Sequence, residues 1–291
     1  MEFITSLAFC PPEELGPLCR AADEAGFFGA ALSDHIIHPQ ELKTPYPYTP
    51  DGKPRWEPFT DWPDPWVTVG YLAAQTERLR FTTSIFVLPM RNPVHVAKAV
   101  GTAAVLSGNR VALGIGVGWM REEFELSEQK FERRGARANE MIEVMRTLWK
   151  GGWVEHHGEF YDFDTLEMSP VPTEEIPIWS GGISEPAIKR AATLCDGWIS
   201  DLHSSKELAD YAQRLAAYRV ESDRAGRPFS LIGSCNDAYD VAGYKRLAKA
   251  GVTHLNTMPW AFYAGPDATL EQKCDGIRRF GEDVIEVMRE A

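Results

Sequence analysis

The sequence has no long apolar segment. Nowhere in its 291 residues do about 18 apolar residues follow one another, the minimum for a helix that spans a membrane. The first residues contain no basic segment, and Pro11 and Pro12 interrupt them before an apolar stretch reaches the length of a signal peptide. These absences argue against a membrane partner, and we expect a cytoplasmic protein.

Positive charge and cysteine are also scarce. The 30 Lys and Arg residues are outnumbered by 42 Asp and Glu residues, which gives a formal net charge of −12. A field of this sign repels phosphate backbones, so we expect no nucleic acid partner. The five cysteines are odd in number, scattered and never spaced as C-x-x-C, which argues against a disulfide framework and a cysteine-bound zinc site.

The sequence does contain a regular alternation of short β-rich segments with longer segments of helical period. The helical pattern is clearest over residues 133–150, where apolar residues recur three and four positions apart before Gly151 and Gly152 end it. No low-complexity linker divides the chain, so we predict a single α/β domain over residues 1–291, a (β/α)8 TIM barrel. Its eight strands are expected at residues 3–9, 28–33, 79–88, 111–115, 176–180, 197–200, 229–235 and 253–258.

Two segments interrupt this alternation. Residues 38–65 contain eight of the chain's 20 prolines, too many for a helix or a central strand, so we predict an extended loop after the second strand. Residues 153–168 alternate around Gly158 like a hairpin inserted before the fifth strand. The extended loop carries aromatic residues that we expect to contact substrate, with the loop either a mobile lid or a fixed cover: Tyr46, Trp56, Trp62 and Trp66.

Polar residues and glycines follow several predicted strands, at the end of the barrel where active sites lie. Gly181 and Gly182 precede a predicted helix over residues 185–194, a pattern that suits either a phosphate site or a plain turn. Gly116 and Gly118 follow the fourth strand, but their G-x-G-x-G spacing departs from the dinucleotide-binding fingerprint.

Asp34 and His35 follow the second strand as a candidate acid/base pair, because a neighbouring carboxylate fixes the tautomer of an imidazole. The alternative is a helix-capping Asp34 beside a packed histidine. His38, His203, His254 and Asp201 have no recognised metal-binding spacing, so we predict no metal site.

Several segments at these positions match a known family. They are SDHI at 33–36, LRFTTSIFVLPMRNPVHVAKA at 79–99, LSGNRVALGIGVGWMREEFE at 106–125, LWKGG at 148–152 and PIWSGGISEPAIKRAATLCDGW at 177–198. In this ordered set the chain resembles the bacterial luciferase-like superfamily, and within it the coenzyme F420-dependent oxidoreductases.

The resemblance implies a planar deazaflavin held in the barrel mouth. Asp34 would bind the head of the cofactor, and His35 would lie near its reactive carbon as proton donor or acceptor. Further cofactor contacts are implied at Ser84, Ile85, Gly116, Val117, Gly118, Gly181, Gly182 and Ile183. The resemblance also predicts a non-prolyl cis peptide bond between Ser84 and Ile85, forming a bulge behind the ring.

The implied function is hydride transfer between F420 and a small, fairly apolar organic substrate, by a protein that the resemblance indicates to be a homodimer. The alternatives are an FMN-dependent luciferase-like monooxygenase, a non-catalytic flavin-binding relative, and a metal-dependent hydrolase using His35, His38 and His203. The substrate-side proton donor stays open, because Trp119 stands where some relatives have Glu and the first strand offers no Glu. Glu13, Glu14 and Glu122 are the remaining acidic candidates for the substrate-side proton donor.

Overall fold

The computed structural model describes residues 1–265 and 267–290 and confirms the predicted (β/α)8 barrel. All neighbouring strands of the barrel run parallel, in the order β3, β2, β1, β11, β10, β9, β8, β5, and β5 pairs with β3 to close it. The strands are β1 (Glu2–Ser6), β2 (Gly29–Leu32), β3 (Arg80–Thr83), β4 (Phe86–Val87), β5 (Val111–Gly116), β8 (Ile178–Gly181), β9 (Gly197–His203), β10 (Ser230–Cys235) and β11 (His254–Thr257).

The predicted third strand is interrupted. It divides into β3 and β4, with a short 3₁₀ turn, η1 (Leu88–Met90), directly after β4. The peptide bond between Ser84 and Ile85, at the interruption, is cis, as predicted. Two other boundaries differ by three residues: β1 ends at Ser6 because the chain turns away at residues 7–10, and β9 extends to His203, while the remaining strand ends lie within two residues of the prediction.

The helices are α1 (Pro12–Glu24), α2 (Pro65–Ala73), α3 (Pro93–Ser107), α4 (Arg121–Leu126), α5 (Arg134–Trp149), α6 (Glu185–Leu194), α7 (Ser205–Val220), α8 (Val241–Lys249), α9 (Ala261–Ala264), α10 (Leu270–Phe280), a π-helical turn, η2 (Gly281–Glu286), and α11 (Val287–Arg289). Their ends follow local sequence. Asp64 caps α2 and Asn92 caps α3, and Gly108 ends α3 in the left-handed conformation. None of the helices in the described ranges is long and apolar enough to cross a membrane.

The apolar core has two main parts. The larger part lies between the strands and the surrounding helices. The smaller part fills the barrel itself with Ile4, Ala31, Ala112, Trp179, Ile199 and Ile232. Because these side chains fill the interior, the barrel is a packed core rather than a pore, and chemistry is confined to its ends.

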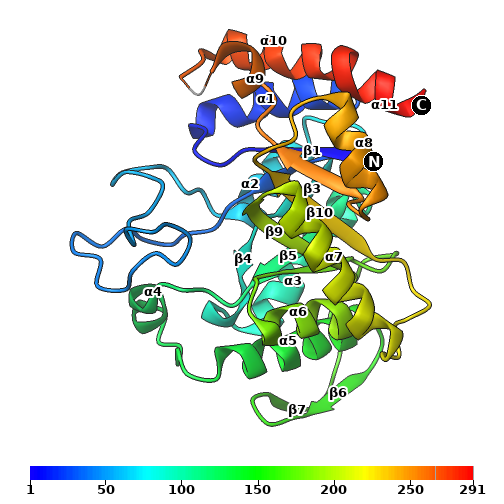
Figure 1. Cartoon of the computed structure of the whole chain (residues 1–291). Helices are drawn as coiled ribbons and strands as arrows, with labels where there is room; N and C mark the ends of the chain where they lie inside the picture. The colour runs from blue at the N-terminus through cyan, green and yellow to red at the C-terminus, as the bar shows by residue number, and fades with distance from the viewer. Residues whose placement is uncertain (266, 291) are drawn as a thin grey trace.

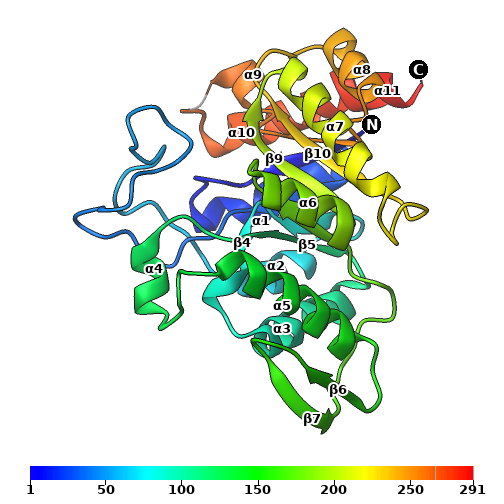
Figure 2. The same cartoon turned by 60° about the horizontal axis from the view of Figure 1, so that its bottom comes forward.

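The two predicted interruptions lie in different parts of the molecule. The extended loop after β2 forms no helix or strand up to Asp64, and it projects beside α4 at the end of the barrel toward which β1 runs (Figures 1 and 2). The hairpin of β6 (Val154–His157) and β7 (Asp162–Leu166) lies away from that loop, against α5 (Figure 2). Glu140 of α5 accepts hydrogen bonds from the N–H groups of Phe160 and Tyr161 at the tip of the hairpin.

Candidate active site at the barrel mouth

Three of the predicted segments meet at one point, where the side chain of Ile85 projects from the interruption between β3 and β4. A Cβ atom added to Gly116 would lie 2.3 Å from Cδ1 of Ile85, and one added to Gly181 would lie 3.0 Å from its Cγ2. The two glycines, at the ends of β5 and β8, therefore leave the space that the Ile85 side chain fills. The cis bond and both glycine segments thus lie at a single place in the barrel mouth.

Asp34 does not pair with the ring of His35, and the predicted acid/base pair is wrong. Its carboxylate instead accepts two hydrogen bonds from Arg91, at 2.6 and 2.7 Å, and one from the N–H of Val87 at 2.8 Å. Burial raises the pKa of Asp34, and the Arg91 guanidinium and the Val87 N–H act in the opposite direction. Asp34 does not cap a helix either; it joins the end of β2 to β4.

The carboxylate beside His35 belongs to Glu123, a residue that sequence reasoning missed. Nδ1 of His35 lies 3.1 Å from Oε1 of Glu123, and the N–H of Ile36 donates to the same oxygen at 2.7 Å. Glu123 lies on α4, and its side chain is 2% exposed. The available signal was its place in the REEFE segment, directly after Glu122, but 88 positions separate it from His35.

Aromatic rings surround the other faces of His35. Its ring centroid lies 4.6 Å from that of Trp56, 5.3 Å from Trp62 and 6.1 Å from Trp119. Tyr46 packs edge-on against Trp56 and Trp119, at 5.3 and 5.1 Å. We call Tyr46, Trp56, Trp62 and Trp119 the aromatic cluster. Under this cluster only 11% of the His35 side chain is exposed.

The structure places Trp66 elsewhere. It lies in the first turn of α2, where its side chain is buried and packs against Phe86 at 6.2 Å between ring centroids. Trp66 is therefore not among the rings around His35, because its ring belongs to the core between helix and barrel, and its contact with substrate stays a prediction. Trp119 takes its place in the cluster, although the sequence had marked it only as a departure from the family.

Polar contacts fasten the extended loop at two further points. Glu122 accepts hydrogen bonds from the N–H groups of Lys43 and Thr44, at 2.8 and 3.1 Å, and from the hydroxyl of Thr44. Arg55 pairs with both carboxylate oxygens of Asp201, at the end of β9, at 2.9 Å each. The aromatic cluster is thereby held over His35 from α4 on one side and β9 on the other.

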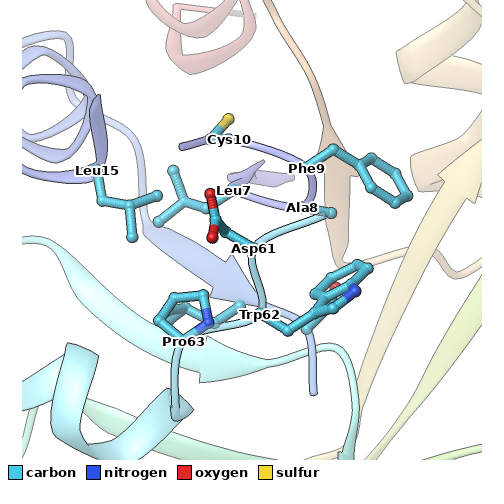
Figure 3. A pocket seen from close by; sticks show the side chains of 10 residues that line it. Leu7, Ala8, Phe9, Cys10, Leu15, Asp61, Trp62 and Pro63 are labelled. Atoms are coloured by element: carbon cyan, nitrogen blue, oxygen red, sulfur yellow. The ribbon is translucent and has the colours of Figure 1, made fainter. Parts of the chain in front are cut away.

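A hollow lies between this loop and the chain after β1 (Figure 3). Figure 3 shows Leu7, Ala8, Phe9 and Cys10 on one side and Asp61, Trp62 and Pro63 on the other. Its volume is about 280 Å³ when space open to solvent is included. Only about 10 Å³ of this hollow is wide enough for the centre of a water molecule, whereas small-molecule sites usually enclose about 300–1,000 Å³, so the loop leaves little room at the mouth in this conformation.

The predicted tail-binding loops contain two glycines with positive φ. Gly118 has φ +76° and Gly182 has φ +106°, which only glycine adopts readily. Trp198 donates from Nε1 to the carbonyl of Gly182 at 2.9 Å and so holds the loop before α6. Ser184, at the N-terminal end of α6, makes no capping hydrogen bond with its side chain, and Ile183 is exposed while Val117 is half-buried. An anion is compatible with this helix end.

Within residues 1–265 and 267–290, no three or more His, Cys, Asp or Glu side chains are grouped so that they would hold a metal ion. The histidines of the hydrolase alternative are therefore not brought together in the described ranges. All five cysteines are free, and Cys10, Cys19 and Cys195 are buried.

Comparison with known proteins shows that this chain has relatives of similar sequence. An uncharacterised protein of Mycobacterium tuberculosis is 38% identical and covers 92% of this chain and 93% of its own. An F420-dependent glucose-6-phosphate dehydrogenase of Nakamurella multipartita is 31% identical over 74% of this chain and 60% of its own.

Solved structures share the fold at low sequence identity. An F420-dependent secondary alcohol dehydrogenase, in complex with an F420-acetone adduct, has a TM-score of 0.76 at 17% identity, and 99% of both chains are covered. The F420-dependent tetrahydromethanopterin reductase of Methanopyrus kandleri has 0.74 at 16%, again with 99% of both chains covered. The profile of the luciferase-like monooxygenases matches residues 3–238. The chain therefore belongs to the luciferase-like monooxygenase family.

Proposed function

We propose that this protein is an F420-dependent oxidoreductase that transfers a hydride between the deazaflavin and a small, fairly apolar organic substrate. The observation that carries the proposal is the meeting of the Ile85 side chain, next to the cis bond, with Gly116 and Gly181 at the mouth of the barrel. Support for the cofactor comes from the relatives, because one at 31% identity and two structures of the same fold are named as F420-dependent enzymes.

The residues present fit such a cofactor. Ile85 and the chain on either side of it, Ser84 included, would back the planar ring, and Asp34 would act at the head through the wall that it forms with Arg91. The glycine-containing loops would receive the tail: Gly116, Val117 and Gly118 after β5, and Gly181, Gly182 and Ile183 before α6. When bound, F420 would supply a carbon that gives or accepts a hydride.

His35 would exchange a proton with the substrate or stabilise charge that develops beside it. An imidazole suits this role because one ring nitrogen can donate a proton while the other accepts one. The aromatic cluster above His35 would exclude water and favour apolar substrates. Because the cluster now covers His35, we propose that residues 38–64 act as a lid that moves when ligands enter.

The second candidate is an FMN-dependent monooxygenase. The family name favours it, as does a monooxygenase of Streptomyces bottropensis, RslO1, whose structure matches with a TM-score of 0.74 at 17% identity over 99% of both chains. Titration of the purified protein with each cofactor, followed through quenching of tryptophan fluorescence, separates the two. We expect tight F420 binding, whereas tight FMN binding with none for F420 would overturn the proposal.

We also propose that the protein works as a homodimer, on the resemblance to its family alone. Light scattering from the purified protein would then give twice the chain mass of 32.6 kDa. A mass of one chain at micromolar concentration would contradict this.

A further inference from the structure

His35 has two ring nitrogens, and the structure gives them different surroundings. Nδ1 lies 3.1 Å from Oε1 of Glu123. Among the described residues, 1–265 and 267–290, Nε2 has no hydrogen-bond partner, and the aromatic cluster surrounds the ring. In a neutral imidazole one nitrogen carries the proton and the other accepts one, so these surroundings decide which nitrogen does which.

The backbone N–H of Ile36 favours a Glu123 Oε1 that presents lone pairs to the ring. The N–H of Ile36 can only donate, and it donates to Oε1 at 2.7 Å. An oxygen that accepts this bond turns lone pairs toward its neighbours. An unprotonated Nδ1 would then face those lone pairs with its own, which is repulsive, whereas a protonated Nδ1 donates a second hydrogen bond.

Glu123 is held firmly in this position. Its neighbour Phe124 is fully buried and packs with Val87 and Met90, and a Cβ atom on Gly118 would lie 2.7 Å from the Phe124 ring. The carboxylate of Asp34, the residue directly before His35 in sequence, instead accepts hydrogen bonds from Arg91 and Val87. Glu123 is therefore the carboxylate that acts on the His35 ring.

We propose that Glu123 is a positioning residue that keeps the proton of neutral His35 on Nδ1 and so leaves Nε2 as the atom that exchanges a proton in the active site. This inference rests on the proposed role of His35 in hydride transfer. A carboxylate that fixes the tautomer of a catalytic histidine keeps the accepting nitrogen available without itself taking the proton.

Nitrogen NMR of the protein without cofactor tests the tautomer directly. In ¹⁵N-labelled protein, long-range correlations from the ring carbon-bound protons distinguish a protonated Nδ1 from a protonated Nε2, and the His35→Gln variant identifies the His35 signals. We expect Nδ1 to carry the proton in the wild-type protein. In Glu123→Ala we expect the proton to move largely to Nε2, because the acceptor is gone.

Glu125→Ala is the matched control, since Glu125 lies two residues from Glu123 on α4 but its side chain is exposed. It should leave the His35 pattern unchanged. Should Glu123→Ala fail to fold, Glu123→Met keeps most of the side-chain volume but offers no oxygen to Nδ1, so the Nδ1–H fraction should fall in that variant as well. A wild-type proton on Nε2, or a pattern unaffected by the Glu123 variants, would overturn the proposal.

Turnover gives a second measurement. Glu123→Ala should lower kcat by about tenfold or more, because the acceptor for the Nδ1 proton is gone. The Kd for F420 should change by less than about threefold. If the wild-type protein does not bind F420, the proposed function fails while the tautomer assignment stands. If it binds F420 and turns over but the His35 proton lies on Nε2, the function stands and the role of Glu123 fails.

Discussion

Arg91 and Asp34 form a two-point ion pair in the wall of the barrel mouth, with Nη1 2.6 Å from Oδ2 and Nη2 2.7 Å from Oδ1. Nη1 of Arg91 also donates to the carbonyl of Val87, and the guanidinium lies 4.1 Å from the centroid of the Phe86 ring. The pair thus joins the end of β2, directly before His35, to β4 on the far side of the cis bond.

Removing Arg91 should destabilise the protein strongly. The Asp34 side chain is 1% exposed, and Arg91→Ala would leave its charge buried with the Val87 N–H but no opposite charge, which costs about 3–5 kcal/mol. Urea unfolding at neutral pH measures this. Arg78→Ala is the control, because the Arg78 side chain is largely exposed and its pair with Asp23 spans 3.7 Å, so we expect a loss below about 1 kcal/mol. Equal losses of unfolding free energy in the two variants would show that the buried Arg91–Asp34 pair stabilises the protein no more than the exposed Arg78–Asp23 pair does.

Gly116→Ala should destabilise the site because the new Cβ would overlap Ile85. The nearest atoms are Cδ1 at 2.3 Å and Cγ1 at 2.8 Å, whereas Cβ lies at 3.6 Å. We expect a loss of about 1–3 kcal/mol from overpacking. In Gly116→Ala combined with Ile85→Ala, both close atoms are absent, so the combined loss should fall short of the sum by about 1 kcal/mol. Strict additivity in chemical unfolding would contradict this packing.

A second glycine gives the comparison. Gly70 lies within α2, and a Cβ added there would meet no atom within 4 Å. Gly70→Ala should therefore stabilise the protein by about 0.5–1 kcal/mol through helix propensity. A loss of stability in this variant would show that the surface of α2 is covered in solution.

His35→Ala should abolish most turnover and spare cofactor binding. Loss of the proton-exchanging group should lower kcat/KM by about 10²–10⁴-fold, with the Kd for F420 nearly unchanged. His95→Ala, at an exposed position on α3, should behave as wild type. Steady-state oxidation of reduced F420 with a panel of activated alkenes, ketones and imines supplies the rates. A wild-type protein that binds F420 but turns over none of them would favour a non-catalytic relative.

Breaking the Arg55–Asp201 pair should loosen the lid without unfolding the barrel. The two side chains are 36% and 30% exposed, so Arg55→Ala should cost less than about 1 kcal/mol of stability. Hydrogen–deuterium exchange of residues 38–64 should nevertheless become faster, as it should in Asp201→Asn. Arg133→Ala breaks an exposed pair with Glu159 in the hairpin and should leave exchange in the lid unchanged. Identical exchange in all variants would show a fixed cover.

His254 should make the protein less stable in mild acid. Burial lowers its pKa from 6.5 to about 4. Above pH 6.5 the folded and unfolded states are both neutral at this site, and between pH 6.5 and 4 only the unfolded state binds the proton, so stability falls as pH falls. The full difference corresponds to at most about 3 kcal/mol.

Urea unfolding between pH 7.5 and 4.5 measures the contribution of His254. The slope of stability against pH should flatten in His254→Gln. His157→Gln is the control. The hydrogen bond to Asp162 raises the pKa of the exposed His157, the direction opposite to that at His254, so His157→Gln should not flatten the slope. A wild-type slope in His254→Gln would contradict the assignment.

The backbone plan was predictable from the sequence because its signals are local. Apolar periodicity and the Gly and Pro boundaries gave all eight strands of the barrel and the inserted hairpin, with ends that shifted by a few residues. Proline density gave the loop after β2 in the same way. The family resemblance added the cis bond between Ser84 and Ile85, which periodicity alone does not reveal.

The side-chain partners at the mouth were decided only by the tertiary structure. Asp34 pairs with Arg91, 57 positions away, and His35 pairs with Glu123, 88 positions away, although the sequence places Asp34 and His35 next to each other. Neighbouring residues at the end of a strand point to opposite sides, so adjacency in sequence does not make a pair. Which side chains meet is determined when barrel closure brings the ends of distant strands, and the loops after them, to one edge.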